Sequence, residues 1–192
     1  MVTETGIKEE LILIKSAIED PKNFEPLYEK YFEEVYRFVQ RRMNNVDESA
    51  DVTQEIFIKV MLNLHKFKYK GFPFSAWLFR IAYNEVNTFF RKNSRSKEVY
   101  YGPQDLAYLL PEFKDEIEDK ILFELKWEAV VNSFNVLKED QVKLIELRFI
   151  DKRSYKEISE IMNITEANAK IKVFRSLKKL KAVLLKEQNF KN

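Results

Sequence analysis

One stretch near the C-terminus constrains the fold of this chain more than any other: RSYKEISEIMNITEANAKIKVFRSLKKLK, residues 153–181. Ser154 and Glu157 have the spacing of a capping box, in which each side chain accepts a hydrogen bond from a backbone N–H that a helix start leaves open. A helix should therefore begin directly after Ser154. Asn163 tolerates the left-handed backbone of a tight turn, and Thr165 is placed to cap a following helix. The stretch predicts a helix-turn-helix.

The second helix of this motif has two unlike sides. Its apolar residues recur at helical spacing and should face a core: Ala169, Val173, Leu177, Leu180 and Leu184. Its other side is cationic, with no acid between Glu166 and Glu187, and carries Lys170, Lys172, Arg175, Lys178, Lys179 and Lys181. A solvated helix usually mixes charges of both signs, so a cationic row behind a capped turn favours binding to duplex DNA.

Four residues near the start of this second helix are candidates for reading bases: Lys170, Ile171, Phe174 and Arg175. The N-terminal part of a recognition helix meets base edges, while cations further along neutralise phosphates. Ile171 and Phe174 are apolar and lie off the core stripe, so each could touch a thymine methyl group. The alternative for Phe174 is that its ring folds back onto the first helix of the motif.

Composition sets the fold class. Glycine and proline number only 3 and 5 among 192 residues, and strong helix formers are abundant, which predicts an all-α protein of one or two small domains. The net charge of +2 conceals an uneven distribution. Lys66 to Lys97 hold eight basic residues and one acid, whereas Glu98 to Glu128 hold nine acids and three lysines. Such blocks suit a chain whose parts meet different partners.

Several classes of function find no support in the sequence. The absence of cysteine excludes disulfides and thiolate metal sites, and the single histidine, His65, has no nearby acid with which to form a catalytic set. No glycine-rich phosphate loop or metal-ligand cluster occurs, so we expect no enzyme, no cofactor and no metal. The N-terminal MVTETGIKEELILIK lacks the features of a signal peptide, and no apolar run is long enough to span a membrane. The sequence predicts a cytoplasmic protein.

The N-terminal half predicts three successive helices. The first covers Glu9–Glu19 and ends before Pro21. The second runs to about Met43, where Asn44-Asn45 breaks it, and the third begins with Asp47 or Ser49 as its cap and ends near Leu64. On the third helix, four residues are expected to face mostly outward: Asp51, Gln54, Glu55 and Phe57. An acidic face with one exposed aromatic indicates a partner-binding surface, and the alternative is an ordinary solvated helix face.

A loop and a fourth helix follow. Residues 65–74, HKFKYKGFPF, alternate cations with aromatics, a composition that suits single-stranded nucleic acid because cations track the backbone while aromatic faces stack on bases. About half of these aromatics should instead anchor the loop to the core. The helix expected over Ser75–Arg91 gathers polar residues on one side: Arg80, Tyr83, Asn84, Asn87, Thr88 and Arg91. Asparagine amides can hydrogen-bond base edges, which gives this side a possible reading role.

Composition also divides the chain into domains. Residues 94–116 combine two prolines and a glycine with a net negative end, which predicts a flexible linker. We therefore expect a helical domain over residues 1–93 and a second over residues 117–192. The second should hold two further helices ahead of the helix-turn-helix, and neither domain shows an internal repeat.

Several motifs in a fixed order give the chain a family resemblance. They are FEPLYEKYFEEVYRFVQRRM, DVTQEIFIKVMLNL, FSAWLFRIAYNEVNTFFRK and finally LRFIDKRSYKEISEIMNITEANAKIKVFRSLKKL. Over about residues 20–186 the chain resembles bacterial sigma factors of the extracytoplasmic-function (ECF) group of the sigma-70 family, which hold only regions two and four. The resemblance implies two small helical domains, a region-two-like bundle and a region-four-like helix-turn-helix, that bind core RNA polymerase and the −10 and −35 promoter elements.

The resemblance also implies roles for individual residues. Asp51, Gln54, Glu55 and Phe57 match the stretch that docks on the clamp helices of the largest polymerase subunit. The part that melts and reads the −10 element corresponds to Lys68, Lys70, Phe72, Arg80, Tyr83, Asn84, Asn87, Thr88 and Arg91. The −35 reader corresponds to Lys170, Ile171, Lys172, Phe174, Arg175, Lys178 and Lys179. Thr88 stands where the family commonly has Asp, which leaves the −10 base preference open, and an anti-sigma factor is a further possible partner.

Three other classes of protein remain as alternatives. A dimeric helix-turn-helix regulator would explain residues 137–186 but leaves the acidic helix and the aromatic-cationic loop without a role. An enzyme would need catalytic residues that the sequence does not offer. A helical interaction module without DNA would show no salt-sensitive binding to DNA or polymerase.

Overall fold

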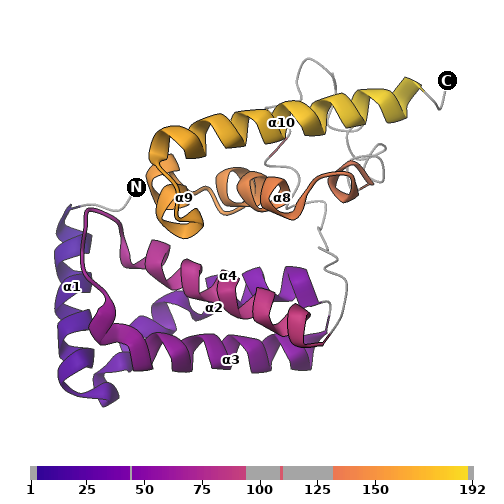
Figure 1. The fold of residues 1–192 in the computed structure, drawn as a ribbon. Helices are drawn as coiled ribbons and strands as arrows, with labels where there is room; N and C mark the ends of the chain where they lie inside the picture. Colours follow the sequence, from indigo (N-terminus) through magenta and orange to yellow (C-terminus); the bar gives the residue numbers. More distant parts are fainter. Residues whose placement is uncertain (1–3, 44, 94–108, 110–131, 190–192) are drawn as a thin grey trace. The chain divides into compact units, whose positions relative to one another are not determined.

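The computed structural model describes residues 4–43, 45–93, 109 and 132–189. The chain divides into two compact units, residues 1–100 and 101–192 (Figure 1). All regular elements of the described residues are helices, which confirms the all-α prediction. None of these helices is both long and apolar enough to cross a bilayer. Nearly all of the predicted linker, and the first helix predicted for the second domain up to residue 131, lie outside the described residues.

The first unit holds four α-helices and two short 3₁₀ helices. They are α1 (Glu4–Glu19), η1 (Pro21–Phe24), α2 (Glu25–Met43), α3 (Val46–Asn63), η2 (Leu64–Lys66) and α4 (Phe74–Lys92). The helix pairs α2–α3 and α3–α4 are in close contact, and α1 stands across one end of the bundle (Figure 1). The first helix begins five residues earlier than the sequence predicts.

The core of this unit is rich in aromatic rings. Phe38, Phe74 and Phe79 are among the largest fully buried side chains, and Phe38 meets Phe79 edge to face at 5.5 Å between ring centroids. Burial of such rings removes a large apolar area from water, which stabilises a bundle this small. The inner side of α3 contributes Val52, Ile56 and Val60, which are all buried.

The cap of α3 differs from the prediction. Neither Asp47 nor Ser49 caps the helix, because Asn45 lies in extended backbone and its side-chain oxygen accepts a hydrogen bond from Glu48 N at 3.0 Å. Ser49 is buried one turn further on, and its hydroxyl donates to the carbonyl of Asn45 at 2.5 Å. Asn45, which in the sequence marks the end of the preceding helix, also starts the next one.

The second unit is built around one long helix. Its elements with described bounds are α8 (Glu139–Ile145), a π-helical turn η4 (Glu146–Ile150), α9 (Tyr155–Met162) and α10 (Glu166–Asn189). Both α8 and α9 pack against α10, and Figure 1 shows α10 lying along them. Their buried side chains, among them Leu144, Ile158 and Ile161, form one core with the apolar stripe of α10.

Candidate nucleic-acid and protein-binding surfaces

The helix-turn-helix forms as its local signals predict. Ser154 Oγ accepts from Glu157 N at 3.2 Å, and a Glu157 carboxylate oxygen accepts from Ser154 N at 2.9 Å, which completes the capping box. Asn163 adopts left-handed backbone with φ 53°, and Thr165 Oγ1 accepts from Asn168 N at 3.3 Å. The turn and the start of α10 are therefore fixed by side chains within the motif itself.

The two sides of α10 separate as predicted. All five residues of its apolar stripe are buried, including Ala169 and Val173. Ile171 is 49% and Phe174 67% exposed, so the alternative in which Phe174 folds back onto α9 is wrong. Exposed cations surround these two apolar residues: Lys170, Lys172, Arg175 and Lys178.

Lys179 does not belong to this exposed face. Its ammonium group donates to Gln141 Oε1 at 3.1 Å and to the carbonyl of Val136 at 3.4 Å, and the residue is half-buried. Lys179 thus differs from the other cations predicted to meet DNA, because its ammonium group is directed toward Gln141 of α8. It fastens α10 to the segment that enters α8.

Two arginines stabilise the start of α9, and the sequence analysis did not identify either of them as a structural residue. Arg153 is buried, and its guanidinium lies 3.5 Å from the Glu157 carboxylate. Arg148 stacks over the Tyr155 ring at 4.6 Å and donates to the carbonyl of Arg153 at 3.0 Å. Both arginines lie within a few residues of the start of α9, whose first turn contains Glu157, and this proximity in the sequence could have indicated their role.

The loop between η2 and α4 is anchored by some of its aromatics and presents others. Phe67 packs edge to face against Phe74 and Trp77, with ring centroids 5.3 Å and 5.7 Å away. Gly71 has φ 80°, a left-handed conformation that glycine adopts without steric cost. Tyr69 is 45% exposed and the sequence prediction of site residues overlooked it. Lys68 and Lys70 beside it are exposed, while Phe72 is half-buried.

The predicted polar side of α4 is only partly exposed. Asn84 and Arg91 are exposed, and Arg80, Asn87 and Thr88 are half-buried. These five residues still lie toward one side of the helix.

Tyr83 departs from that prediction. It is buried, and its ring packs against Phe38 at 4.5 Å while its hydroxyl accepts from Arg42 Nη2 at 3.3 Å. Arg42 is itself buried, with its guanidinium 3.8 Å from the centroid of the Phe38 ring. Tyr83 follows Phe79 by four residues and precedes Val86 by three, so helical periodicity places it on the core stripe, and its assignment to an accessible reading face is wrong.

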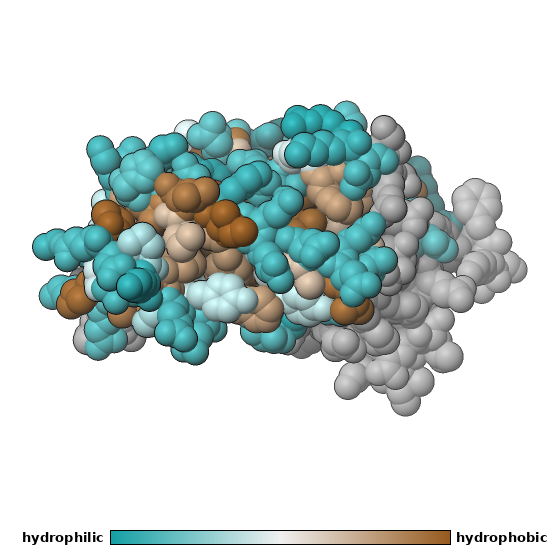
Figure 2. Space-filling model, turned by 90° about the horizontal axis from the view of Figure 1, so that it is seen from below, coloured by the Kyte–Doolittle hydropathy of each residue, from teal (hydrophilic) through white to brown (hydrophobic). Residues whose placement is uncertain are grey.

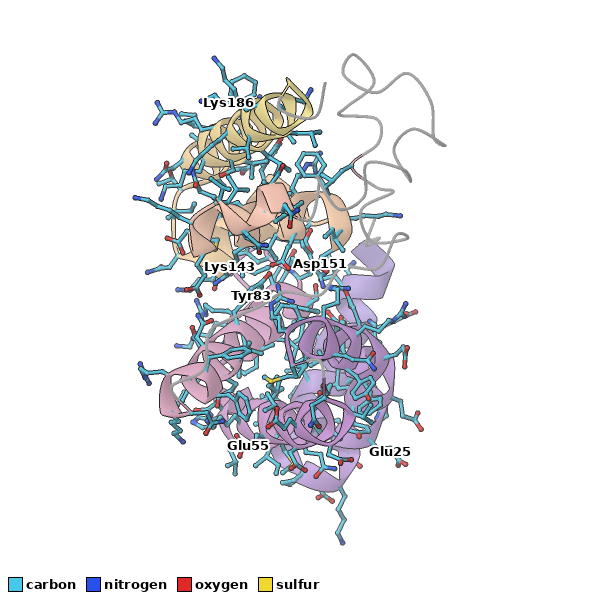
Figure 3. All side chains as sticks on the ribbon, turned by 90° about the vertical axis from the view of Figure 1, so that its right-hand side faces the viewer. Glu25, Glu55, Tyr83, Lys143, Asp151 and Lys186 are labelled. Carbon is cyan, nitrogen blue, oxygen red and sulfur yellow. The ribbon has the colours of Figure 1, made fainter. Side chains whose placement is uncertain are left out.

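On α3, three of the four predicted partner-binding residues are exposed: Asp51, Gln54 and Glu55. Figure 3 shows Glu55 on the outer side of the first unit. Phe57 is buried, and its expected outward orientation is wrong. Its ring packs edge to face on Tyr28, with centroids 4.8 Å apart, because position 57 falls on the same side as the buried Thr53 and Val60.

In the second half of α3, Ile58 and Leu62 are apolar and exposed, at 52% and 64% of their accessible surface, and neither was predicted as a site residue. The neighbouring Lys59 forms an ion pair with Glu85, which ties α3 to α4. Within residues 4–43, 45–93, 109 and 132–189, no group of three His, Cys, Asp or Glu side chains could hold a metal ion.

Comparison with known proteins identifies the family. The family models for sigma-70 region 2 and for sigma-70 region 4 match residues 27–96 and 127–180. The ECF RNA polymerase sigma factor SigW of Bacillus subtilis is 30% identical over 192 residues, which cover 94% of this chain and 98% of SigW. The chain belongs to the ECF group of sigma-70 factors. The sigma factor is also 29% identical over 84% of its length to the ECF RNA polymerase sigma factor BldN of Streptomyces coelicolor, and the match spans 60% of BldN.

A solved structure supports the fold of this sigma factor. The sigma factor RpoE of Bartonella quintana, in a co-crystal with the anti-sigma factor NepR, matches with a TM-score of 0.58 and 20% sequence identity, covering 85% of this chain and 97% of RpoE. Sigma factors regulate transcription: they direct RNA polymerase to promoters. The dimeric helix-turn-helix regulator is accordingly not favoured.

Proposed function

We propose that this sigma factor divides its work between its two helical parts. Residues 1–93 would bind core RNA polymerase and the −10 element, residues 117–192 would bind the −35 element, and residues 94–116 would join them. The observation that carries the proposal is the contrast between two exposed surfaces: an acidic one on α3 and a cationic one on α10. Joining two modest DNA contacts through one polymerase raises the effective concentration of each at the promoter.

The polymerase contact is assigned to the exposed side chains of α3. Asp51, Gln54 and Glu55 lie within about one turn of each other, and the two carboxylates make no ion pair with a described residue. They suit a basic partner segment such as the clamp helices of the largest polymerase subunit. Phe57 supports this face from inside by packing on Tyr28 rather than by touching the partner.

The −10 contact is assigned to the loop of residues 67–73 and the polar side of α4. Lys68 and Lys70 can follow the phosphates of a single strand, and the exposed ring of Tyr69 can stack on an unpaired base. Taking a base out of the duplex costs a few kcal/mol, which stacking and phosphate contacts must offset. The remaining contacts are assigned to side chains that are exposed or half-buried: Phe72, Arg80, Asn84, Asn87, Thr88 and Arg91. Tyr83 positions α4 through Arg42 and Phe38.

The −35 contact is assigned to the first turns of α10. Arg175 and Lys170 can hydrogen-bond base edges in the major groove, and Ile171 and Phe174 can contact thymine methyl groups. Lys172 and Lys178 are exposed further around and along the helix and can neutralise phosphates. This contact should therefore weaken strongly with rising salt.

The partners follow from this assignment. They are core RNA polymerase and promoter DNA, and the RpoE–NepR co-crystal supports an anti-sigma factor as a third partner. We assign the protein no catalytic activity of its own, and the cytoplasm, where polymerase works, as its location.

The proposal is tested by transcription in vitro from core polymerase, with and without the purified sigma factor, on a library of promoter fragments. Initiation at defined promoters only when the sigma factor is present is the expected result. A control template has its −35 sequence scrambled. Tight binding of a dimer to duplex DNA without polymerase, and no promoter-selective initiation, would instead identify a free-standing regulator.

A further inference from the structure

The outer side of α3 carries a continuous stripe of exposed residues, in which two acidic side chains are followed by two apolar ones. Asp51, Glu55, Ile58 and Leu62, here called the α3 stripe, follow one another at spacings of four, three and four residues, so they share one face of the helix. All four are exposed. The stripe is acidic over its first half and apolar over its second. Figure 2 looks onto the underside of the first unit, where α3 lies in Figure 1, and shows apolar side chains gathered there among hydrophilic ones.

The exposure of Ile58 and Leu62 is not forced by the fold. The inward positions of α3 are filled by buried residues such as Ile56 and Val60, so the helix is already packed without this pair. Two large apolar side chains one turn apart and more than half exposed form a ready contact site for another protein surface. The spacing of four, three and four is that of a helix–helix seam, which indicates an α-helix as the partner.

The stripe also selects the chemistry of that partner. A second copy of α3 does not complement it: parallel pairing sets acids against acids, and antiparallel pairing buries the carboxylates of Asp51 and Glu55 against Leu62 and Ile58. A complementary helix carries a cation opposite the acidic half and an apolar side chain opposite the other half. Lys59 does not neutralise the acidic half from its own helix, since it pairs with Glu85.

We propose that Ile58 and Leu62 are the apolar anchor of the polymerase docking surface, and that the unequal halves of the α3 stripe fix the direction in which the polymerase helix lies. This rests on the proposed function, which places polymerase on α3. From Asp51 to Leu62 the stripe is roughly 17 Å long at about 1.5 Å per residue, or three turns of contact. Binding energy concentrates in buried apolar anchors, while exposed charges at an interface mainly guide the approach.

The two halves therefore act on different rate constants. The acidic half accelerates association and makes it salt-dependent, because long-range attraction steers the encounter. The apolar half slows dissociation, because its contacts form only in the docked complex.

The test is a kinetic measurement of the full-length sigma factor binding to core polymerase, with the double variant Ile58→Ser and Leu62→Ser. We expect its dissociation rate to rise about tenfold or more and its association rate to stay within about twofold. The double variant Asp51→Asn and Glu55→Gln should do the opposite: slower association and a weaker dependence on salt. The matched control is Val46→Ser, 63% exposed on the same helix but about 150° around it at 100° per residue, which should leave both rates unchanged.

Each other outcome has a definite meaning. Suppose that the wild-type protein binds core polymerase and that the Ile58→Ser and Leu62→Ser double variant dissociates no faster than the wild type or than Val46→Ser. The assignment of Ile58 and Leu62 as the apolar anchor is then wrong, while the proposed function stands. If the wild-type protein does not bind, the proposed function itself fails. If the serine pair abolishes self-association seen by light scattering and leaves polymerase kinetics unchanged, the pair serves a second copy and the proposal is overturned. Circular dichroism confirms that each surface variant is folded.

Discussion

The two surfaces proposed to meet promoter DNA are built in opposite ways. α10 presents its cations and apolar side chains from a continuous helix whose start is fixed by Thr165. The loop of residues 67–73 presents Lys68, Tyr69 and Lys70 from irregular backbone, attached to the core by Phe67. A helix fits the regular groove of duplex DNA, whereas a loop with aromatic and cationic tips can follow unpaired bases. The duplex −35 element is thus matched by a helix, and the melted −10 element is matched by a loop.

The largest effect should come from removing the anchor of the loop. Phe74→Ala takes away a buried ring that contacts both Phe67 and Trp77, and should destabilise the first unit by ~3–5 kcal/mol. The same change on the exposed surface, Phe174→Ala, should alter stability by no more than about 0.5 kcal/mol. Urea unfolding followed by circular dichroism compares the two. Equal losses would mean that the loop and the recognition helix do not differ in their dependence on core packing.

Arg175→Ala tests the helix side of the comparison. Loss of one base-edge contact should reduce discrimination between native and scrambled −35 sequences by ~1–3 kcal/mol, so −35-dependent transcription should fall about 5- to 150-fold. Lys170→Ala should act in the same direction. Lys186→Ala, an exposed cation in the last turns of α10, is the matched control. Variants that transcribe equally well from native and scrambled −35 sequences would remove the reading roles of Arg175 and Lys170.

Tyr69→Ala tests the loop side. Stacking on an unpaired base contributes ~1–3 kcal/mol, so affinity of the holoenzyme for a single-stranded −10 oligonucleotide should fall about tenfold. Tyr69→Phe keeps the ring and should restore most of that affinity. Binding to duplex −35 DNA should not change in either variant. A phenylalanine variant as weak as the alanine variant would assign the effect to the hydroxyl and not to stacking.

Ser154→Ala should have a smaller effect, confined to the helix-turn-helix. The hydroxyl accepts from Glu157 N, and its loss should cost ~1 kcal/mol of stability in the second unit. Thermal unfolding of the full-length protein measures it, and Lys156→Ala, an exposed residue of the same helix, is the control. No difference between the two variants would show that the capping box is dispensable.

The smallest expected effect is a difference between Lys178 and Lys179 of α10 in the salt dependence of DNA binding. Lys178 is exposed, so Lys178→Ala should reduce the slope of log affinity against log salt by about 1 for duplex −35 DNA. Lys179 is held by Gln141, so Lys179→Ala should leave that slope nearly unchanged. Equal slopes in the two variants would mean that Lys179 leaves Gln141 to bind phosphate.

The parts of the fold that the sequence predicted correctly depend on short-range signals. Ser154 and Glu157 are three residues apart, and the stripe beginning at Ala169 is a periodicity within one helix. The errors involve distant partners. Phe57 is buried because Tyr28 and other rings of the preceding helices meet it, and Tyr83 because Phe38 does. Spacing along one helix places both residues beside core positions, but it does not identify the distant rings that bury them.

The candidate site follows the same pattern. Lys179 has the same charge and helix as its neighbours, and only a residue 38 positions away, Gln141, distinguishes it. Tyr69 was overlooked among several aromatics because the packing of Phe67 on Phe74 and Trp77, which leaves Tyr69 as an exposed ring, depends on how the loop closes on α4. Ile58 and Leu62 were missed for a related reason: which of the apolar residues on α3 are surplus to the core depends on the other helices.

The ion pair between Lys59 and Glu85 joins the helix assigned to the protein partner with the helix assigned to the melted strand. With α3 and α4 packed against each other, a tilt of one is transmitted to the other. Binding of RNA polymerase by α3 and the orientation of the melted strand on α4 are then coupled. A substitution that changes one should therefore need a compensating change in the other.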